Sequence, residues 1–143
     1  MPVPDDPYDL DRFVRAQAPD YARALSELRA GQKRSHWMWY IFPQIEGLGG
    51  SAMSRRYSIK SEAEAKAYLE RPVLGSRLRE CFAAVQNIEG RSALEIFGSP
   101  DDLKLRSSAT LFAVVSDEAV FDDVLQKYFD GKHDEETLRR LRG

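Results

Sequence analysis

The chain has 143 residues, of which 43% are hydrophobic and 31% are charged. These values are typical of one folded domain, and a chain of this length buries enough surface to need neither disulfides nor a metal. Its 21 basic and 23 acidic residues leave a net charge of −2, which argues against a nucleic-acid partner. No window approaches the ~18 consecutive apolar residues of a membrane span, and a lone cysteine forms no internal disulfide. We therefore expect a cytoplasmic protein without a membrane partner.

The N-terminal part of the sequence predicts an extended lead-in and two helices. Residues 1–8 contain prolines at positions 2, 4 and 7, which oppose helix formation. Asp9 is placed to cap a short helix, whose inward face carries residues three and four apart: Leu10, Phe13, Val14 and Gln17. A second helix is expected from Pro19 to about Gly31, with Glu27 among the residues facing outward.

The second half of the sequence predicts a further series of helices. Ser61 with Glu64, and Ser92 with Glu95, have the spacing of a capping box, in which each side chain accepts a hydrogen bond at the helix start. Other helices are expected over residues 72–87, 103–115, 117–131 and 135–141 from their apolar spacing and their Pro, Asp and Gly boundaries. No repeat or long linker divides them. The sequence predicts an all-α fold: a single compact irregular domain of about seven to nine helices over residues 9–143.

The most unusual segment runs from His36 to Phe42, with the sequence HWMWYIF. Its apolar side chains follow neither a single helical stripe nor strict alternation, and a segment that is apolar all round is usually buried all round. We expect about two helical turns that end before Pro43, with a buried strand as the lesser alternative. Residues 43–60, which include Gly47, Gly49 and Gly50, are then expected to be mostly loop.

Several segments resemble a known bacterial family: SHWMWYIFPQ (35–44), GLG (47–49), KLRSSATLF (104–112) and YFDG (128–131). Over about residues 8–142 the chain resembles the domain-of-unknown-function family 1810, which is similar to a small all-helical mycobacterial protein of unassigned role. The resemblance implies an all-α fold and brings no catalytic residue or ligand with it. Some members are labelled calpastatin. A calpain inhibitor of that kind is a disordered chain, whereas this sequence predicts core-forming helices throughout.

Polar residues around the aromatic segment form a candidate pocket. His36 is the candidate acid or base, since histidine titrates near neutral pH. The ligand-binding candidates are Trp37, Trp39 and Tyr40 as a stacking wall, Gln44 as a polar contact, Arg55 and Arg56 as attractors of an anion, and Lys104, Ser107 and Ser108 across the core. These residues favour the binding of a nucleotide-like or other anionic small molecule, with hydrolase or transferase activity as an extension.

Each candidate also has an ordinary structural explanation, which the sequence leaves open. His36 can cap a helix, the aromatic rings can be core, and the glycine loop can be a plain connection. The alternative function is therefore a non-catalytic protein–protein interaction module. No metal-ligand spacing is present, so we expect no metal and no cofactor. The sequence leaves open whether the protein is an enzyme, and also its oligomeric state.

Overall fold

The computed structural model describes residues 6–142 as ten helices, seven of which have seven or more residues. The helices are α1 (Asp11–Gln17), α2 (Tyr21–Arg29), α3 (Met38–Ile41), α4 (Ala52–Arg56), α5 (Glu62–Glu70), α6 (Pro72–Gln86), α7 (Ala93–Phe97), α8 (Asp101–Val115), α9 (Ala119–Phe129) and α10 (Glu135–Arg142). The predicted all-α single domain is confirmed. The expected lead-in over residues 1–8 lies largely outside the described residues.

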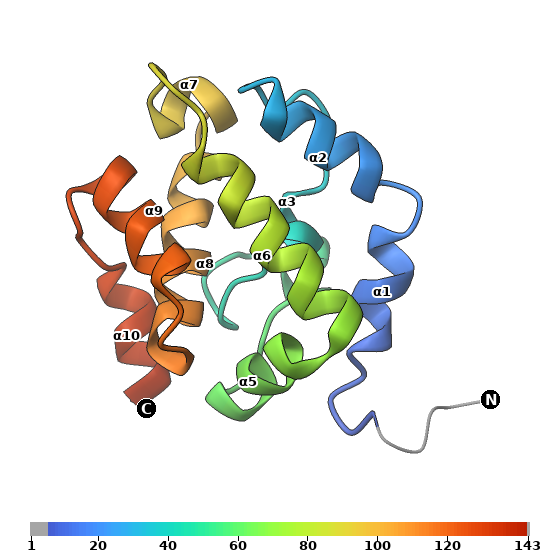
Figure 1. Ribbon diagram of the computed structural model, residues 1–143. Coiled ribbons are helices and arrows are strands. Elements are labelled where there is room, and N and C mark those ends of the chain that lie inside the picture. Colours follow the sequence, from blue (N-terminus) through green and yellow to red (C-terminus); the bar gives the residue numbers. More distant parts are fainter. Residues whose placement is uncertain (1–5, 143) are drawn as a thin grey trace.

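Two 15-residue helices, α6 and α8, organise the packing. In Figure 1, α6 crosses the front of the molecule, with α1 and α2 on one side and α8, α9 and α10 on the other. Helix α6 packs against α2, α5 and α9, and α8 packs against α5, α7, α9 and α10. The apolar faces of these helices meet in one core. No helix within residues 6–142 is long and apolar enough to cross a membrane.

The aromatic segment lies at the centre of this core. In Figure 1, the short helix α3 is in the middle of the molecule, behind α6. The side chains of Trp37 and Phe42 are 0% exposed, and the Phe42 ring packs edge-on against Phe82 of α6 with ring centres 4.9 Å apart. The burial of these two aromatic residues is as expected, but the helix is shorter than the expected two turns. Trp37 and Phe42 have non-helical backbone angles, so only one turn forms.

Polar groups fix the aromatic segment to α2. Glu27 of α2 accepts hydrogen bonds from the Trp37 indole (3.0 Å), from the Ser35 hydroxyl (2.6 Å) and from the backbone N–H groups of Arg34 and Ser35. Burial disfavours the carboxylate, but these donors outweigh it and lower the pKa of Glu27 to about 2. The expectation that Glu27 faces outward was wrong, because four donors from the following loop converge on it.

The segment after Pro43 is more ordered than expected. The Gln44 carbonyl accepts a hydrogen bond from the Ile59 N–H, and the Glu46 N–H donates to the Ile59 carbonyl, both at 2.8 Å. These bonds close the base of the intervening loop. Within it, the Ser51 hydroxyl caps α4 by accepting a hydrogen bond from the Ser54 N–H. The expected loop over residues 43–60 therefore contains a helix, whose five residues are too short to show apolar periodicity.

Arg12 holds the start of α1 against this closed loop. Its guanidinium, 8% exposed, donates to the carbonyl groups of Tyr8, Asp9, Arg56 and Ser58 and to the Glu64 carboxylate. Glu64 in turn accepts from the Lys60 N–H, whereas a capping box requires the N–H of Ser61. The Ser61–Glu64 pattern thus marks the helix start correctly, but its carboxylate serves a buried ion pair. The box predicted at Ser92 and Glu95 is complete.

Candidate functional site

The largest described hollow is an open cleft of about 440 Å³ beside the glycine loop (residues 47–51). One wall is the loop from Gly49 to Ser51 and α4, and the other is formed by α8 and the start of α10. The lining residues are Gln44, Leu48, Gly49, Gly50, Ser51, Ser54, Pro100, Leu103, Lys104, Ser107, Asp134 and Glu136. Three of the residues predicted from the sequence, Gln44, Lys104 and Ser107, therefore come together in one cleft.

Lys104 is the cation of this cleft, and its position is set by Trp39 and Asp101. Its Nζ lies 5.6 Å from the centre of the Trp39 ring and 3.3 Å from the Asp101 carboxylate. Asp101 also pairs with the nearly buried Lys33 at 2.9 Å. Because one carboxylate is shared by two lysines, the positive charge of Lys104 is only partly neutralised. The half-buried Trp39 contacts this cation and does not itself line the cleft; it lines a small neighbouring hollow together with Gln44 and Gly49.

The three neighbouring hydroxyl residues of α8, Ser107, Ser108 and Thr110, differ in their contacts. Ser107 lines the cleft, and its Oγ contacts the Leu103 carbonyl at 3.1 Å and the Asp134 carboxylate at 3.2 Å. Thr110 accepts a hydrogen bond from the Asp134 N–H and so fixes the start of α10. Ser108 is fully buried, and its hydroxyl has no hydrogen-bond partner among the described residues. Part of the cluster thus joins α8 to α10, and only Ser107 faces the cleft.

The glycine loop contributes residues 48–51 to the other wall of the cleft. The N–H groups of Gly49, Gly50 and Ser51 donate no hydrogen bond to any residue within the described range 6–142. The loop is held from both sides: Arg55 donates to the Gly50 carbonyl at 2.5 Å, and the guanidinium of Arg140 occupies the space that a side chain at Gly47 would need. Gly47 also has a φ of +98°, a conformation that favours glycine. Unpaired N–H groups on a loop of this kind can donate hydrogen bonds to an anionic or carbonyl oxygen of a ligand.

The remaining predicted residues lie elsewhere. Trp37 and Tyr40 are buried in the core, where the Tyr40 hydroxyl donates to the Asp20 carboxylate. Desolvation and this bond raise the pKa of Tyr40 above its usual value. His36 is exposed, lines none of the four described hollows, and makes no side-chain hydrogen bond with residues 6–142. Its proposed part in acid–base chemistry stays a prediction.

Arg55 and Arg56 line a separate hollow on the other side of α4. This second hollow has a volume of about 420 Å³. Its lining residues are Tyr8, Asp9, Arg12, Arg15, Arg55, Arg56 and Lys60. The two arginines therefore do not converge with Gln44, Lys104 and Ser107 on one hollow.

Two carboxylates of the cleft were not among the candidates from the sequence. Asp134 caps α10 by accepting hydrogen bonds from the Thr137 N–H and hydroxyl, and Glu136 pairs with Arg139 and Arg140. The sequence marks Asp134 as a helix start, but nothing in the local pattern shows that this start packs beside Ser107. Within residues 6–142, no group of three or more His, Cys, Asp or Glu side chains is placed to hold a metal ion.

A family model and a solved structure both match this chain over nearly its whole length. The family described as protein of unknown function (DUF1810) matches residues 7–141. The chain is also similar to a solved structure, the conserved hypothetical protein Rv1873 from Mycobacterium tuberculosis, with 53% identity and a TM-score of 0.95. That match covers 96% of this chain and 99% of the other. None of the curated proteins matches. The chain thus belongs to the DUF1810 family of proteins of unknown function.

Proposed function

We propose that the protein binds a small anionic metabolite in the cleft between the glycine loop and α8. The observation that supports this most directly is that Lys104, Gly49 and Gly50 line one hollow of about 440 Å³, and that the N–H groups of the two glycines donate to no residue within 6–142. A cation and unpaired backbone donors together favour a phosphate or carboxylate group. The volume falls within the ~300–1,000 Å³ range of small-molecule sites.

Two carboxylates on the wall formed by α8 and α10 set a second requirement for the ligand. Asp134 and Glu136 accept hydrogen bonds and repel a second anionic group. The ligand that fits this cleft has one anionic group facing Lys104 and hydroxyl or amino donors facing the carboxylates. A sugar phosphate or the ribose phosphate part of a nucleotide has this distribution of groups.

The other functions considered have less support. Hydrolysis or group transfer with His36 as acid or base lacks a geometric argument, because that exposed ring lines none of the described hollows. The protein–protein interaction module stays an alternative prediction. Within residues 6–142, the large exposed apolar side chains come from five separate segments: they are Tyr8, Met53, Val73, Leu94, Leu103 and Val114.

A binding experiment with matched variants tests the proposal. The ligands are ribose 5-phosphate, glycerol 3-phosphate, AMP and ADP-ribose, and the readout is isothermal titration calorimetry supported by thermal shift. A ligand at one hundred times its dissociation constant raises stability by about 2.7 kcal/mol. We expect Lys104→Ala to weaken binding, and Lys66→Ala, an exposed lysine of α5, to leave it unchanged. Binding that does not depend on Lys104 would place the ligand outside the cleft.

A further inference from the structure

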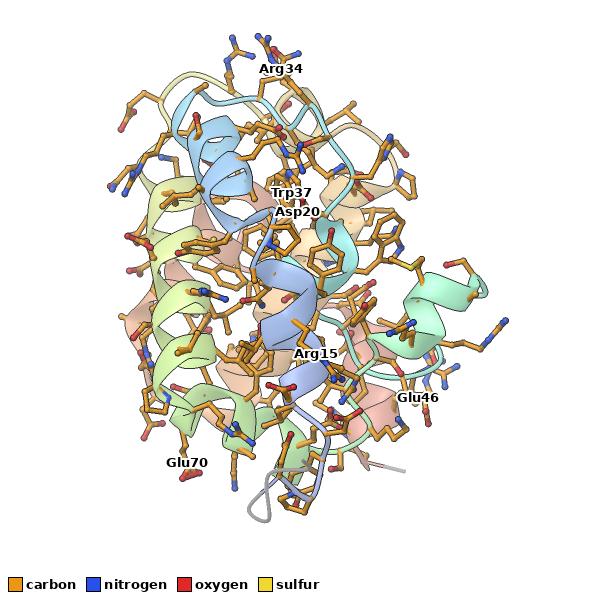
Figure 2. The ribbon with its side chains drawn as sticks, turned by 90° about the vertical axis from the view of Figure 1, so that its right-hand side faces the viewer. Arg15, Asp20, Arg34, Trp37, Glu46 and Glu70 are labelled. Carbon is orange, nitrogen blue, oxygen red and sulfur yellow. The ribbon has the colours of Figure 1, made fainter. Side chains whose placement is uncertain are left out.

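The second hollow, between α1 and the segment from Arg55 to Lys60, has an unusual concentration of positive charge. Among the described residues, five cationic side chains line it, from Arg12, Arg15, Arg55, Arg56 and Lys60, together with one carboxylate, from Asp9. In Figure 2, α1 with the labelled Arg15 faces the viewer, and α4 stands out at the right. In a chain with a net charge of −2, this local excess is not a consequence of overall composition.

The charges of this hollow are only partly compensated. Arg15 pairs with Asp11 at 3.3 Å, and the Arg55 side chain, among the described residues, donates to the Gly50 carbonyl alone. Within residues 6–142, the side chains of Arg56 and Lys60 have no hydrogen bond or ion pair, and the Arg56 guanidinium lies over the Tyr57 ring. Like charges held in one hollow repel each other, and a bound anion removes that repulsion.

The hollow is also built rigidly. The Arg12 guanidinium spans the floor, donating to the Arg56 carbonyl at 2.9 Å and to the Ser58 carbonyl at 2.8 Å. These bonds fix the segment that carries Arg56 and Lys60 against the helix that carries Arg15. These two hydrogen bonds of Arg12 therefore set the distance between the wall from α1 and the wall from residues 55–60. Walls that are held in place before the ligand arrives lower the entropic cost of binding.

We propose that this hollow is a second anion site, separate from the cleft, and that it takes a compact molecule bearing a diphosphate group. Four exposed cations come from two walls, and a diphosphate has enough charge and oxygen atoms to pair with both walls at once. An extended nucleic acid is a poorer match, because the positive region is confined to one hollow of about 420 Å³ on a protein that is acidic overall.

The test is calorimetric titration of the full chain with inorganic pyrophosphate at low and at physiological ionic strength. We expect the wild-type protein to bind, more weakly as salt rises. The double variant Arg56→Gln with Lys60→Gln should lose roughly tenfold or more in affinity, and Arg15→Gln, on the other wall, should also weaken binding. The matched control, Arg34→Gln with Lys66→Gln, removes the same two charges from exposed positions elsewhere and should bind as the wild type does.

Lys104→Ala separates this site from the cleft and should leave pyrophosphate binding unchanged. The proposal is overturned if the wild type does not bind pyrophosphate, if the control variant loses as much affinity as the hollow variants, or if Lys104→Ala removes the binding. Orthophosphate binding as tightly as pyrophosphate would contradict the diphosphate assignment. A single-stranded oligonucleotide that binds more tightly than pyrophosphate at equal salt would assign the hollow to nucleic acid instead. Unchanged far-UV circular dichroism confirms that each variant is folded.

Discussion

The ammonium group of Lys104 lies over the face of the Trp39 ring, 5.6 Å from its centre, and so joins α8 to the aromatic segment. Replacing either residue removes the same contact, so the two replacements should not be additive. We expect a double-mutant cycle of Lys104→Ala and Trp39→Leu, which removes the aromatic ring, measured by urea unfolding, to give a coupling energy of about 0.5–1 kcal/mol. Fully additive effects would show that the contact has no energetic value in solution.

Glu27 should make the stability of the fold depend on acid pH. Its pKa is about 2 in the folded protein, against an ordinary glutamate value of 4.5, so its contribution is complete above pH 4.5 and is lost as pH falls towards 2. Glu27→Gln should lower the free energy of unfolding by about 2 kcal/mol at pH 7, and the difference from wild type should shrink below pH 4. The exposed Glu89→Gln is the control. An equal deficit for Glu27→Gln at every pH would contradict the assignment.

Arg12 and Glu64 form a buried ion pair whose separation should be costly. Their side chains are 8% and 2% exposed, and their closest atoms are 2.9 Å apart. Arg12→Met leaves the Glu64 carboxylate buried without its cation, which should cost about 3–5 kcal/mol in urea unfolding. Adding Glu64→Gln should recover part of that loss. If Arg12→Met alone is as stable as the wild type, the guanidinium does not hold α1 to the loop.

Gly75 offers a test in which the usual helix rule should reverse. Alanine in place of glycine inside a helix normally stabilises it by about 1 kcal/mol. A Cβ at residue 75 would instead collide with the backbone carbonyl of Leu69 at the end of α5. Gly75→Ala should therefore destabilise the protein, by roughly 1–3 kcal/mol. Gly50→Ala is the comparison, because a Cβ there meets nothing within 4 Å and should leave thermal stability nearly unchanged.

The sequence predicts the fold where local pattern decides it. The apolar spacing of Leu105 and Phe112 places both in the core, and Ser92 with Glu95 marks the start of α7. Cys81, on the apolar face of α6, is buried, and burial raises the pKa of its thiol to about 12. In each case, burial or the helix start is determined by residues a few positions apart or on one face of a helix.

The surroundings of the aromatic segment and of the cleft depend on contacts between residues far apart in the sequence, which no local pattern predicts. Glu27 looks like a solvent-facing residue of α2 until the next loop brings four donors to it. Ser107 meets Asp134 across 27 residues of chain. Arg55 and Arg56 were expected to serve the same pocket as Gln44, but α4, itself unpredicted, places them in another hollow. Tertiary packing therefore divides the candidate residues between two hollows.

The most direct test of the cleft as a ligand site is titration of the wild type and of Lys104→Ala with ribose 5-phosphate, AMP, ADP-ribose and glycerol 3-phosphate. Lys104 supplies the cation of the cleft, and Arg56 and Lys60 serve the other hollow. We predict that at least one of these ligands binds the wild type, and that its affinity falls by roughly tenfold or more in Lys104→Ala but not in Arg56→Gln with Lys60→Gln. The proposal is contradicted if none of them binds, or if Lys104→Ala binds as the wild type does.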